Sequence, residues 1–386
     1  MADVIAVAGA LAQKPGRGGH TWVFLQYLLG FRRLGYDVLF LDQLAPEMCV
    51  DARGNPCRFR DSYNLAYFLD TMRGSGLSDS FSLDYNHGEE VVGLPRRIVL
   101  ERLRRAGAIV NVMGFLRDDE MLATTRNRVF LDIDPGFGQM WQALGLCQMF
   151  EGHDHYATIG LNIGRSDCEI PTCGVKWITT PQPVVLELWP QQAAQPAVAF
   201  TSVMSWRGAY GTIEYGGKAY GLRVHEFRKV LGLPRQSGRR FEVALDIDSS
   251  DAADLARLAE NGWTLVDSRD VARDPWRYRS YIQNSWAEIC IAKGIYVQSR
   301  SGWLSDRSLC YLASGRPVLA LDTGLRQTYP SGAGLILFST MAEAMAAVEE
   351  LSHDYRKHAA AAVELAQEHF DSDRVLRRLL SKTGVA

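Results

Sequence analysis

The sequence predicts an α/β protein with two doubly wound, parallel-sheet domains that face one another across a cleft. Three observations lead to this prediction. Short apolar runs alternate with longer amphipathic stretches, which is the pattern of strands joined by helical crossovers. The alternation stops at a proline-rich stretch near the middle of the chain and then restarts. The length of 386 residues also suits two domains.

The first half contains five predicted strands, at residues 4–10, 38–41, 109–112, 128–133 and 156–161. Residues 20–34 form a largely apolar predicted helix, and Gly35 ends it because glycine readily adopts the left-handed conformation that follows a helix. Residues 95–106 form another helix. Strands separated by helices pair in parallel, so residues 1–180 are predicted to form the first domain.

Four prolines at residues 181–196 predict a linker between the domains. The second domain is predicted over residues 197–369, with strands at 197–203, 241–247, 264–266, 287–291 and 317–321. Its helices are predicted at 251–261, 275–284, 301–314, 341–351 and 354–370. Residues 370–386 contain a last helix, at 373–380, that is expected to pack back on the first domain.

Composition narrows the class of partner. The 44 acidic and 42 basic residues nearly balance, so neither nucleic acid nor an anionic membrane is expected. No basic residues precede the N-terminal apolar run, and no run reaches about 18 apolar residues, so neither a signal peptide nor a membrane span is predicted. Seven scattered cysteines indicate reduced thiols and a cytoplasmic protein. The only protein partner that we predict is a second copy of the chain, in a homodimer.

The strongest functional signal is the segment from Ser299 to Gly324, SRSGWLSDRSLCYLASGRPVLALDTG. It predicts a Ser/Gly-rich turn, a helix that ends at Gly315, and an apolar strand. Free backbone N–H groups at a helix start bind anions, and small residues let a phosphate come close. The alternative is an ordinary strand–helix–strand unit with a capped helix. The predicted phosphate and ribose contacts are Ser301, Gly302, Ser305, Asp306 and Arg307.

This segment resembles the nucleotide-binding unit of the GT-B glycosyltransferase superfamily. In that superfamily the helix holds the donor pyrophosphate and ends in an Ala-x-Gly-x-Pro-Val run, here residues 313–318. The resemblance implies sugar transfer from a UDP- or dTDP-linked sugar. The best-known branch has two glutamates where this chain has Gly302 and Cys310, so another branch is implied. Ser305, Asp306 or Asp322 could take the place of those glutamates.

A glycine-rich loop, Gly16-Arg17-Gly18-Gly19-His20, separates the first strand from the first helix. Glycines permit a tight turn and close approach of a ligand, so Gly18 and Gly19 are predicted to contact the acceptor. Chains of the superfamily commonly open in this way, and several inverting members use a histidine near this place as general base. His20 is the corresponding candidate here. The alternative is that His20 only caps the helix or lines the cleft.

Two polar groups follow predicted strands of the first half. Asp132 and Asp134 stand at the carboxyl end of a strand, where open α/β sheets bind ligands, and could orient a histidine or act as base. The Asp-Pro-Gly sequence at 134–136 is equally typical of a plain turn. His153 and His155 are predicted to contact the acceptor rather than a metal, because no further ligands follow at metal-binding spacing.

Further donor contacts are predicted in the second half. Ser202 and Arg207 lie in the stretch after its first strand, and loops at this place touch the donor phosphates in the superfamily. Arg207 and Lys218 are candidate phosphate partners, with solvated surface cations as the alternative. Asp267, at a strand end, could contact the nucleotide base. Trp303, beside glycine and serines, is a candidate for the sugar pocket.

These observations and the resemblance predict a metal-independent hexosyltransferase. Its cations and helix start would stabilise the charge on the leaving diphosphate. The sequence Asp132-Ile133-Asp134 has the form of a metal-binding motif but lies in the half away from the donor, so no metal and no cofactor besides the nucleotide sugar are expected. The acceptor is expected to be a small natural product. A nucleotide-sugar epimerase and a non-catalytic nucleotide-binding protein are the alternatives.

Overall fold

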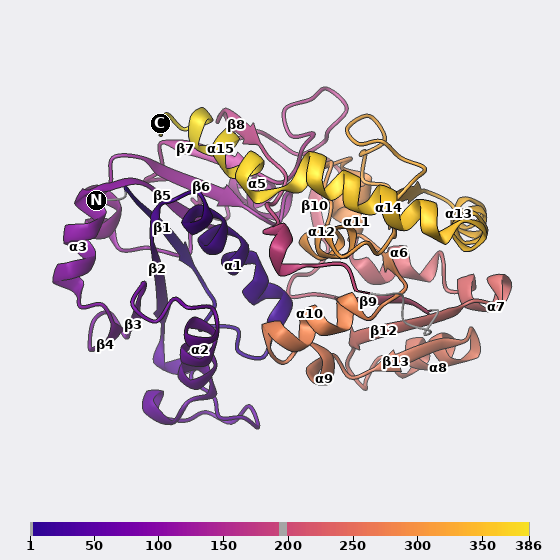
Figure 1. The fold of residues 1–386 in the computed structure, drawn as a ribbon, viewed down its shortest axis with the longest axis horizontal. Helices are drawn as coiled ribbons and strands as arrows, with labels where there is room; N and C mark the ends of the chain where they lie inside the picture. Colours follow the sequence, from indigo (N-terminus) through magenta and orange to yellow (C-terminus); the bar gives the residue numbers. More distant parts are fainter. Residues whose placement is uncertain (1–2, 193–198, 386) are drawn as a thin grey trace.

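Two sheets form the framework of the chain, whose computed structural model describes residues 3–192 and 199–385 (Figure 1). Both sheets wind outward from a central strand, first to one side and then to the other, so the doubly wound architecture is confirmed. The first sheet is parallel except between β3 and β4, and contains in spatial order β4 (Glu90–Gly93), β3 (Phe81–Tyr85), β2 (Asp37–Leu44), β1 (Val4–Gly9), β5 (Ala106–Val112), β6 (Arg128–Asp132), β7 (His155–Thr158) and β8 (Trp177–Thr179). The second sheet is parallel throughout, and contains β13 (Trp263–Val266), β12 (Arg240–Asp246), β9 (Ala199–Ser205), β14 (Ala287–Cys290), β15 (Val318–Leu321) and β16 (Leu335–Phe338).

Alternate residues of β1 face opposite sides of the first sheet. Ile5 and Val7 pack in the core beneath α1 (Gly18–Arg33) and α2 (Tyr63–Gly74). Val4, Ala6 and Ala8 pack on the other face, where α3 (Arg96–Arg104) and α4 (Asp119–Thr124) lie. Because both faces are covered, every residue of β1 is buried, which explains its continuous apolar sequence.

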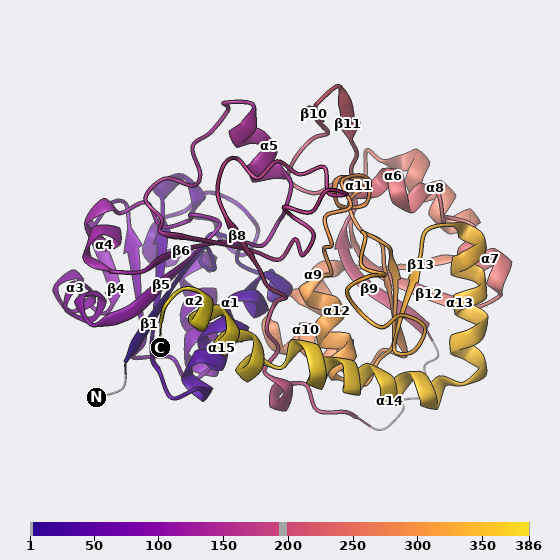
Figure 2. The same ribbon diagram turned by 90° about the horizontal axis from the view of Figure 1, so that it is seen from above.

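The remaining elements cover the second sheet and connect the two halves. The chain leaves the second sheet through α13 and α14 and ends in α15, which lies beside the first sheet (Figure 2). There α15 packs on α1, and Arg33 forms an ion pair with Asp373 at 2.9 Å. The elements are α5 (Phe137–Ala143), the hairpin β10 (Ile213–Tyr215) and β11 (Lys218–Tyr220), α6 (Arg223–Arg228), α7 (Leu233–Ser237), α8 (Ala252–Glu260), α9 (Ser268–Ala272), α10 (Pro275–Gln283), α11 (Gly294–Gln298), α12 (Asp306–Ala313), α13 (Met341–His353), α14 (Tyr355–Leu365), a π-helix (Ala366–Phe370) and α15 (Ser372–Lys382).

One predicted helix starts in the wrong place. The helix expected at 301–314 is α12, which begins at Asp306, where the Ser305 side chain accepts the backbone N–H of Arg307 at 3.3 Å. Arg300 and Gly302 have positive φ angles, and such residues interrupt a helix. The other predicted strands and helices are confirmed in place over their described residues. The elements that were not predicted are α2, α4, α5, α6, α7, α9, α11, β3, β4, β8, β10, β11 and β16. The predicted linker is described only as far as Gln192, and its last residues lie outside the described part.

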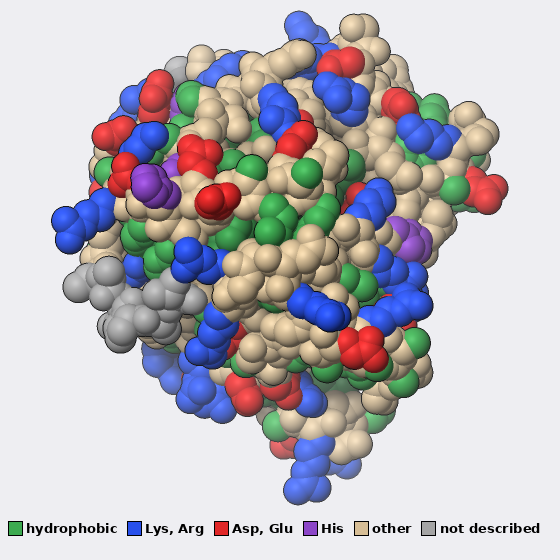
Figure 3. Space-filling model, turned by 90° about the vertical axis from the view of Figure 1, so that its right-hand side faces the viewer, with side chains coloured by type: hydrophobic (Ala, Val, Ile, Leu, Met, Phe, Trp, Pro, Cys, Tyr) green, Lys and Arg blue, Asp and Glu red, His purple; other side chains and the backbone are tan. Residues whose placement is uncertain are grey.

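In residues 3–192 and 199–385 no helix is long and apolar enough to cross a membrane. All seven cysteines are free thiols. Basic and acidic side chains are interspersed over the end of the molecule that carries the second sheet (Figure 3). This distribution agrees with the net charge of −2 and leaves that face without one dominant sign of charge.

The N-terminal end of α1 meets the N-terminal end of α10. Gly18 lies against the carbonyl oxygen of Asp274, and Gly19 lies against the ring of Tyr278. Close by, the indole N–H of Trp22 donates to a backbone carbonyl of α10 at 2.6 Å. A side chain at Gly18 would overlap backbone atoms of α10, so glycine is required for this close approach of the two halves.

We predict that Gly18→Ala lowers the free energy of unfolding by about 1–3 kcal/mol, because the added methyl group must displace the Asp274 carbonyl. Urea denaturation measures the effect. Gly211→Ala is the matched control, since nothing lies within 4 Å of the Cβ it would add. Equal stability of the two variants would show that the α1–α10 contact can relax freely.

Candidate functional site

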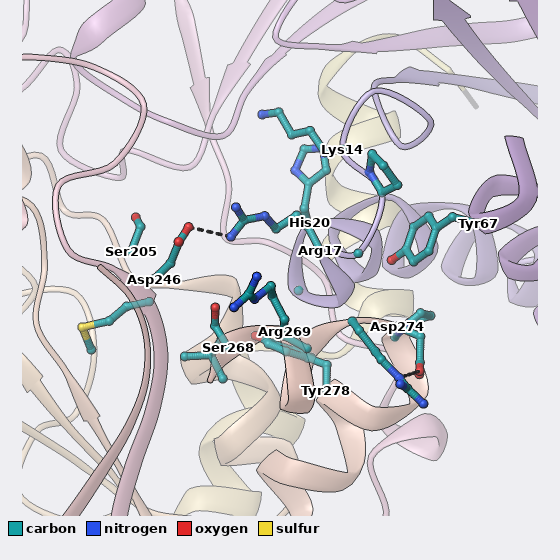
Figure 4. A pocket seen from close by; sticks show the side chains of 18 of the residues that line it. Lys14, Arg17, His20, Tyr67, Ser205, Asp246, Ser268, Arg269, Asp274 and Tyr278 are labelled. Atoms are coloured by element: carbon teal, nitrogen blue, oxygen red, sulfur yellow. Dashed lines mark hydrogen bonds and ion pairs between the residues drawn. The ribbon is translucent and has the colours of Figure 1, made fainter. Parts of the chain in front are cut away.

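A cavity of 1680 Å³ lies between the carboxyl ends of the two sheets (Figure 4). Its first wall is the loop after β1, together with α2. Its second wall consists of the residues that follow β9 and β12 and the starts of α9, α10 and α12. Ligands of open α/β sheets bind at this end of the strands. Single-ligand pockets measure roughly 300–1,000 Å³, so this cavity has room for two substrates.

His20 lies in the first turn of α1 and lines the cavity. Its Nε2 lies 3.1 Å from the carbonyl oxygen of Ala10. A carbonyl only accepts hydrogen bonds, so Nε2 carries the proton of the neutral ring and Nδ1 keeps its lone pair. Burial, followed by the positive charge of Lys14, lowers the pKa of His20 to about 3. The ring is therefore neutral at physiological pH, with Nδ1 able to accept a proton.

The loop after β1 places two cations in the cavity. Arg17 forms an ion pair with Asp246, at the end of β12, with 2.7 Å between Nη1 and Oδ2 (Figure 4). Both side chains are about half exposed, so the pair contributes roughly 0–1 kcal/mol and separates easily. Lys14 lines the cavity from the same loop and makes no ion pair with any described residue.

The opposite wall carries arginines in three environments. Arg223 is buried, and its guanidinium donates to the carbonyls of Ser205 at 2.7 Å and Ile291 at 2.9 Å. Among the described residues it has no carboxylate partner, and burial lowers its pKa. Arg207 instead pairs with Asp251, from Nε at 3.1 Å. The wall therefore holds one buried cation that is hydrogen-bonded to backbone carbonyls and the Ser205 hydroxyl but forms no ion pair with a described carboxylate.

The third arginine, Arg307, lies in the first turn of α12 and also lines the cavity. Its Nε bonds to the fully buried carboxylate of Glu288 at 2.5 Å, and Nη1 donates to the carbonyl of Val203 at 2.7 Å. Its charge is thus neutralised inside the protein. Asp306 lines the cavity beside it, and burial raises the pKa of that carboxyl.

The segment expected to bind phosphate lies in the contact between the two halves. The N–H of Gly302 donates to Thr323 at 2.8 Å, and a Cβ at Gly302 would lie 2.8 Å from Asn162 of the first half. The backbone N–H of Asn162 donates to the carbonyl of Ser301 at 3.1 Å. Trp303 stacks on a neighbouring tyrosine ring. Ser301, Gly302 and Trp303 do not line the cavity.

The two aspartates after β6 have different partners. Asp134 pairs with Lys293 of the second half at 2.8 Å and also accepts the hydroxyl of Tyr296. Asp132 is buried, accepts from Gln139 and Thr158, and has its pKa raised to about 6 by burial. Neither aspartate lines the cavity, so neither touches it directly in this arrangement.

The other predicted residues also lie outside the cavity lining. Lys218 pairs with Glu169 at 2.7 Å, and Asp267 caps α9 while pairing with Arg269. His153 lies 3.0 Å from Asn111, and His155 opens β7. Ser202 is buried within β9, Ser305 caps α12, and Gly18 is in contact with α10. The predicted residues that the cavity brings together are Gly19, His20, Arg207, Asp306 and Arg307.

Sequence reasoning missed most charged residues of the cavity, among them Lys14, Asp246 and Arg223. Lys14 could have been found, because it lies just before the glycine-rich loop that was singled out. Asp246 ends a predicted strand, so the carboxyl-end rule pointed to it. Arg223 carried no signal, since only the folded chain brings it to the ends of β9 and β14. In the described ranges no group of three or more His, Cys, Asp or Glu side chains is placed to hold a metal ion.

The two facing, doubly wound domains define the GT-B fold, and solved structures share it. A glycosyltransferase from Rickettsia africae is 10% identical, with a TM-score of 0.56 over 99% of this chain and 98% of that chain. An α-glucosyltransferase in complex with UDP and DNA is 12% identical, with a TM-score of 0.60 over 100% of both chains. Anabaena HepE in complex with UDP-glucose is 11% identical, with a TM-score of 0.58 over 100% of both chains.

No protein-family model matches the chain, and no curated protein matches its sequence. The resemblance inferred from the sequence is therefore confirmed at the level of the fold. Proposals about the activity, the substrates and the individual site residues are argued from the chemistry of the cavity.

The lowered pKa of His20 predicts a pH effect on stability. In the unfolded chain the ring takes up a proton as the pH falls below its ordinary pKa of 6.5, whereas the folded ring does so only near 3. Stability contributed by the neutral ring is therefore lost as the pH falls through this window. We expect wild type to lose more stability than His20→Gln between pH 7 and pH 4, measured by urea denaturation. Identical losses would contradict the lowered pKa.

Proposed function

We propose that the chain is a glycosyltransferase that moves a sugar from a UDP- or dTDP-linked sugar to an acceptor held in the same cavity. The carrying observation is the pair of cavity cations without a carboxylate partner, Lys14 on one wall and Arg223 on the other. A diphosphate between the walls would meet positive charge from both halves. Charge-assisted hydrogen bonds to phosphate are stronger than neutral ones.

This arrangement also suits the chemistry of the transfer. When the bond between the sugar and the diphosphate breaks, negative charge develops on the leaving oxygen. Fixed donors in a site shielded from water stabilise such charge strongly. The guanidinium of Arg223 is held by two backbone carbonyls at the strand ends, so it needs little reorganisation. We therefore propose a reaction that needs neither a metal ion nor another cofactor, and expect chelators to leave it unchanged.

His20 is the proposed general base toward the acceptor hydroxyl. Its Nε2 proton is directed at Ala10, which leaves Nδ1 as the proton acceptor. A bound diphosphate beside Lys14 and Arg17 would offset their positive charge and raise the pKa of His20 toward the working range. Asp134 is the alternative base, although its pairing with Lys293 across the two halves supports a positioning role.

The acceptor is proposed to be a small natural product and the transferred group a hexose. UDP-glucose is bound in the HepE structure, which supports a hexose donor. The α-glucosyltransferase was solved with DNA, whereas the near-balanced charge of this chain supports a small acceptor. Free thiols support a reducing compartment, so we place the reaction in the cytoplasm. Homodimer formation stays a prediction that sedimentation would test.

Incubation with a panel of nucleotide sugars, with and without candidate acceptors, tests the function. Diphosphate release that depends on an acceptor supports the transferase. An altered sugar formed without acceptor would indicate the epimerase instead. Binding without turnover would indicate a nucleotide-binding protein, and failure to bind any nucleotide sugar would overturn the proposal.

For the donor site, we predict that Lys14→Gln and Arg223→Gln each weaken UDP binding at least about tenfold, since a hydrogen bond to a charged group contributes roughly 1.5–3 kcal/mol. Isothermal titration calorimetry measures the effect. Lys176→Gln is the control, because Lys176 is exposed and does not line the cavity. Unchanged affinity in both cavity variants would count against the phosphate assignment.

For the base, we predict that His20→Gln lowers kcat about 10²–10⁴-fold with little change in the KM for the donor, because proton transfer and not binding is lost. Steady-state kinetics over a pH series measure both quantities. Asp134→Asn serves as the comparison, and a larger kcat loss there would transfer the role of base to Asp134.

A further inference from the structure

A second cavity, of 280 Å³, lies apart from the cleft, where the two connections between the halves cross. The connection from the first half to the second passes here just after β8. The connection back to the first half passes here between the π-helix and α15. The N–H of Val184 donates to the carbonyl of Phe370 at 2.8 Å, and the N–H of Ser372 donates to Val184 at 2.9 Å. The cavity is therefore built from both connections.

Positive charge dominates its lining. Arg374 and Arg378 are four residues apart on α15, which places both on one face of the helix. Neither arginine forms an ion pair with any residue in the described ranges, although most surface arginines of this chain do. Glu368 also lines the cavity, but its side chain is 66% exposed. The cavity thus holds more positive than negative charge.

An unpartnered nitrogen lies in the same wall. The Nε2 atom of His369 is buried and has no hydrogen-bond partner. Its nearest carboxylate oxygen, on Glu368, is 3.9 Å away, which is too far for a hydrogen bond. Buried polar atoms are nearly always hydrogen-bonded in native proteins, so an unpaired one beside a cavity indicates a missing ligand or water.

We infer that this cavity binds a phosphate monoester. Two guanidinium groups at helical spacing match a phosphate dianion, and a turn of the His369 ring would bring its unpaired nitrogen in as a third polar contact. At about 30 Å³ for each water molecule, 280 Å³ leaves room for a small organic group beside the phosphate. A ligand here would tie α15 to the chain that leaves β8, and so stiffen the crossing between the two halves.

Binding of sn-glycerol 3-phosphate to the full chain, measured by isothermal titration calorimetry, tests this inference. We expect the double variant Arg374→Ala/Arg378→Ala to lose at least tenfold in affinity. Arg377→Ala is the matched control, because this exposed neighbour on the same helix does not line the cavity. Lys14→Gln should also bind normally, which separates this site from the diphosphate site of the cleft. Glycerol should not bind.

Hydrogen exchange gives an independent readout of the same site. We expect the ligand to slow exchange of the Val184 and Ser372 amides in wild type and Arg377→Ala, but not in the double variant. Equal affinity of wild type and the double variant, or no binding to wild type, would overturn the inference. Neither outcome bears on the proposed transferase, which depends on the cleft alone.

Discussion

The contact between the starts of α1 and α10 fixes the relation of the two halves on which the cavity depends. Each helix begins near the carboxyl ends of its sheet, so their meeting turns both sets of strand ends toward one space. Gly18 allows the backbones to touch, and the bond from Trp22 holds them in register. Within this loop Gly18 serves the contact between the halves, whereas Gly16, Arg17, Gly19 and His20 line the cavity.

Some arginines of the cavity form ion pairs with carboxylates, and others do not. Arg207 and Arg307 have their charge satisfied by carboxylates, so each would have to give up an ion pair before holding a phosphate. Arg223 is buried and hydrogen-bonds to two carbonyls and the Ser205 hydroxyl, without an ion pair to a described carboxylate. Burial of a cation without a counter-ion is costly, and an incoming anion repays part of that cost. Arg223, which no sequence pattern singled out, thus has the strongest physical reason to bind an anion.

The fold could be predicted because it follows from local patterns. Continuous apolar runs such as β1 indicate burial on both faces of a sheet. The alternation of strands and helices that restarts after the prolines indicates a second sheet. The candidate site could be predicted only where loop chemistry was local, as at His20. Arg223 meets the cavity through tertiary arrangement, which spacing in one segment does not encode. The predicted start of α12 was wrong for a related reason. Gly302 adopts a left-handed conformation and fits against Asn162, a contact that the local sequence does not reveal.

The same contact involves Gly302 and Cys310, the two positions at which the resemblance would place glutamates. At the first position, a side chain on Gly302 would collide with Asn162, which is held there by bonds to the carbonyls of Arg300 and Gly324 at 2.9 and 3.0 Å. At the second, Cys310 is buried within α12 against Gln26 of α1. A carboxylate at either place would be taken out of water in the contact between the two halves, which is costly unless the carboxylate is paired. The contact between the two halves therefore occupies both positions, and the proposed donor would be held by groups elsewhere on the cavity wall.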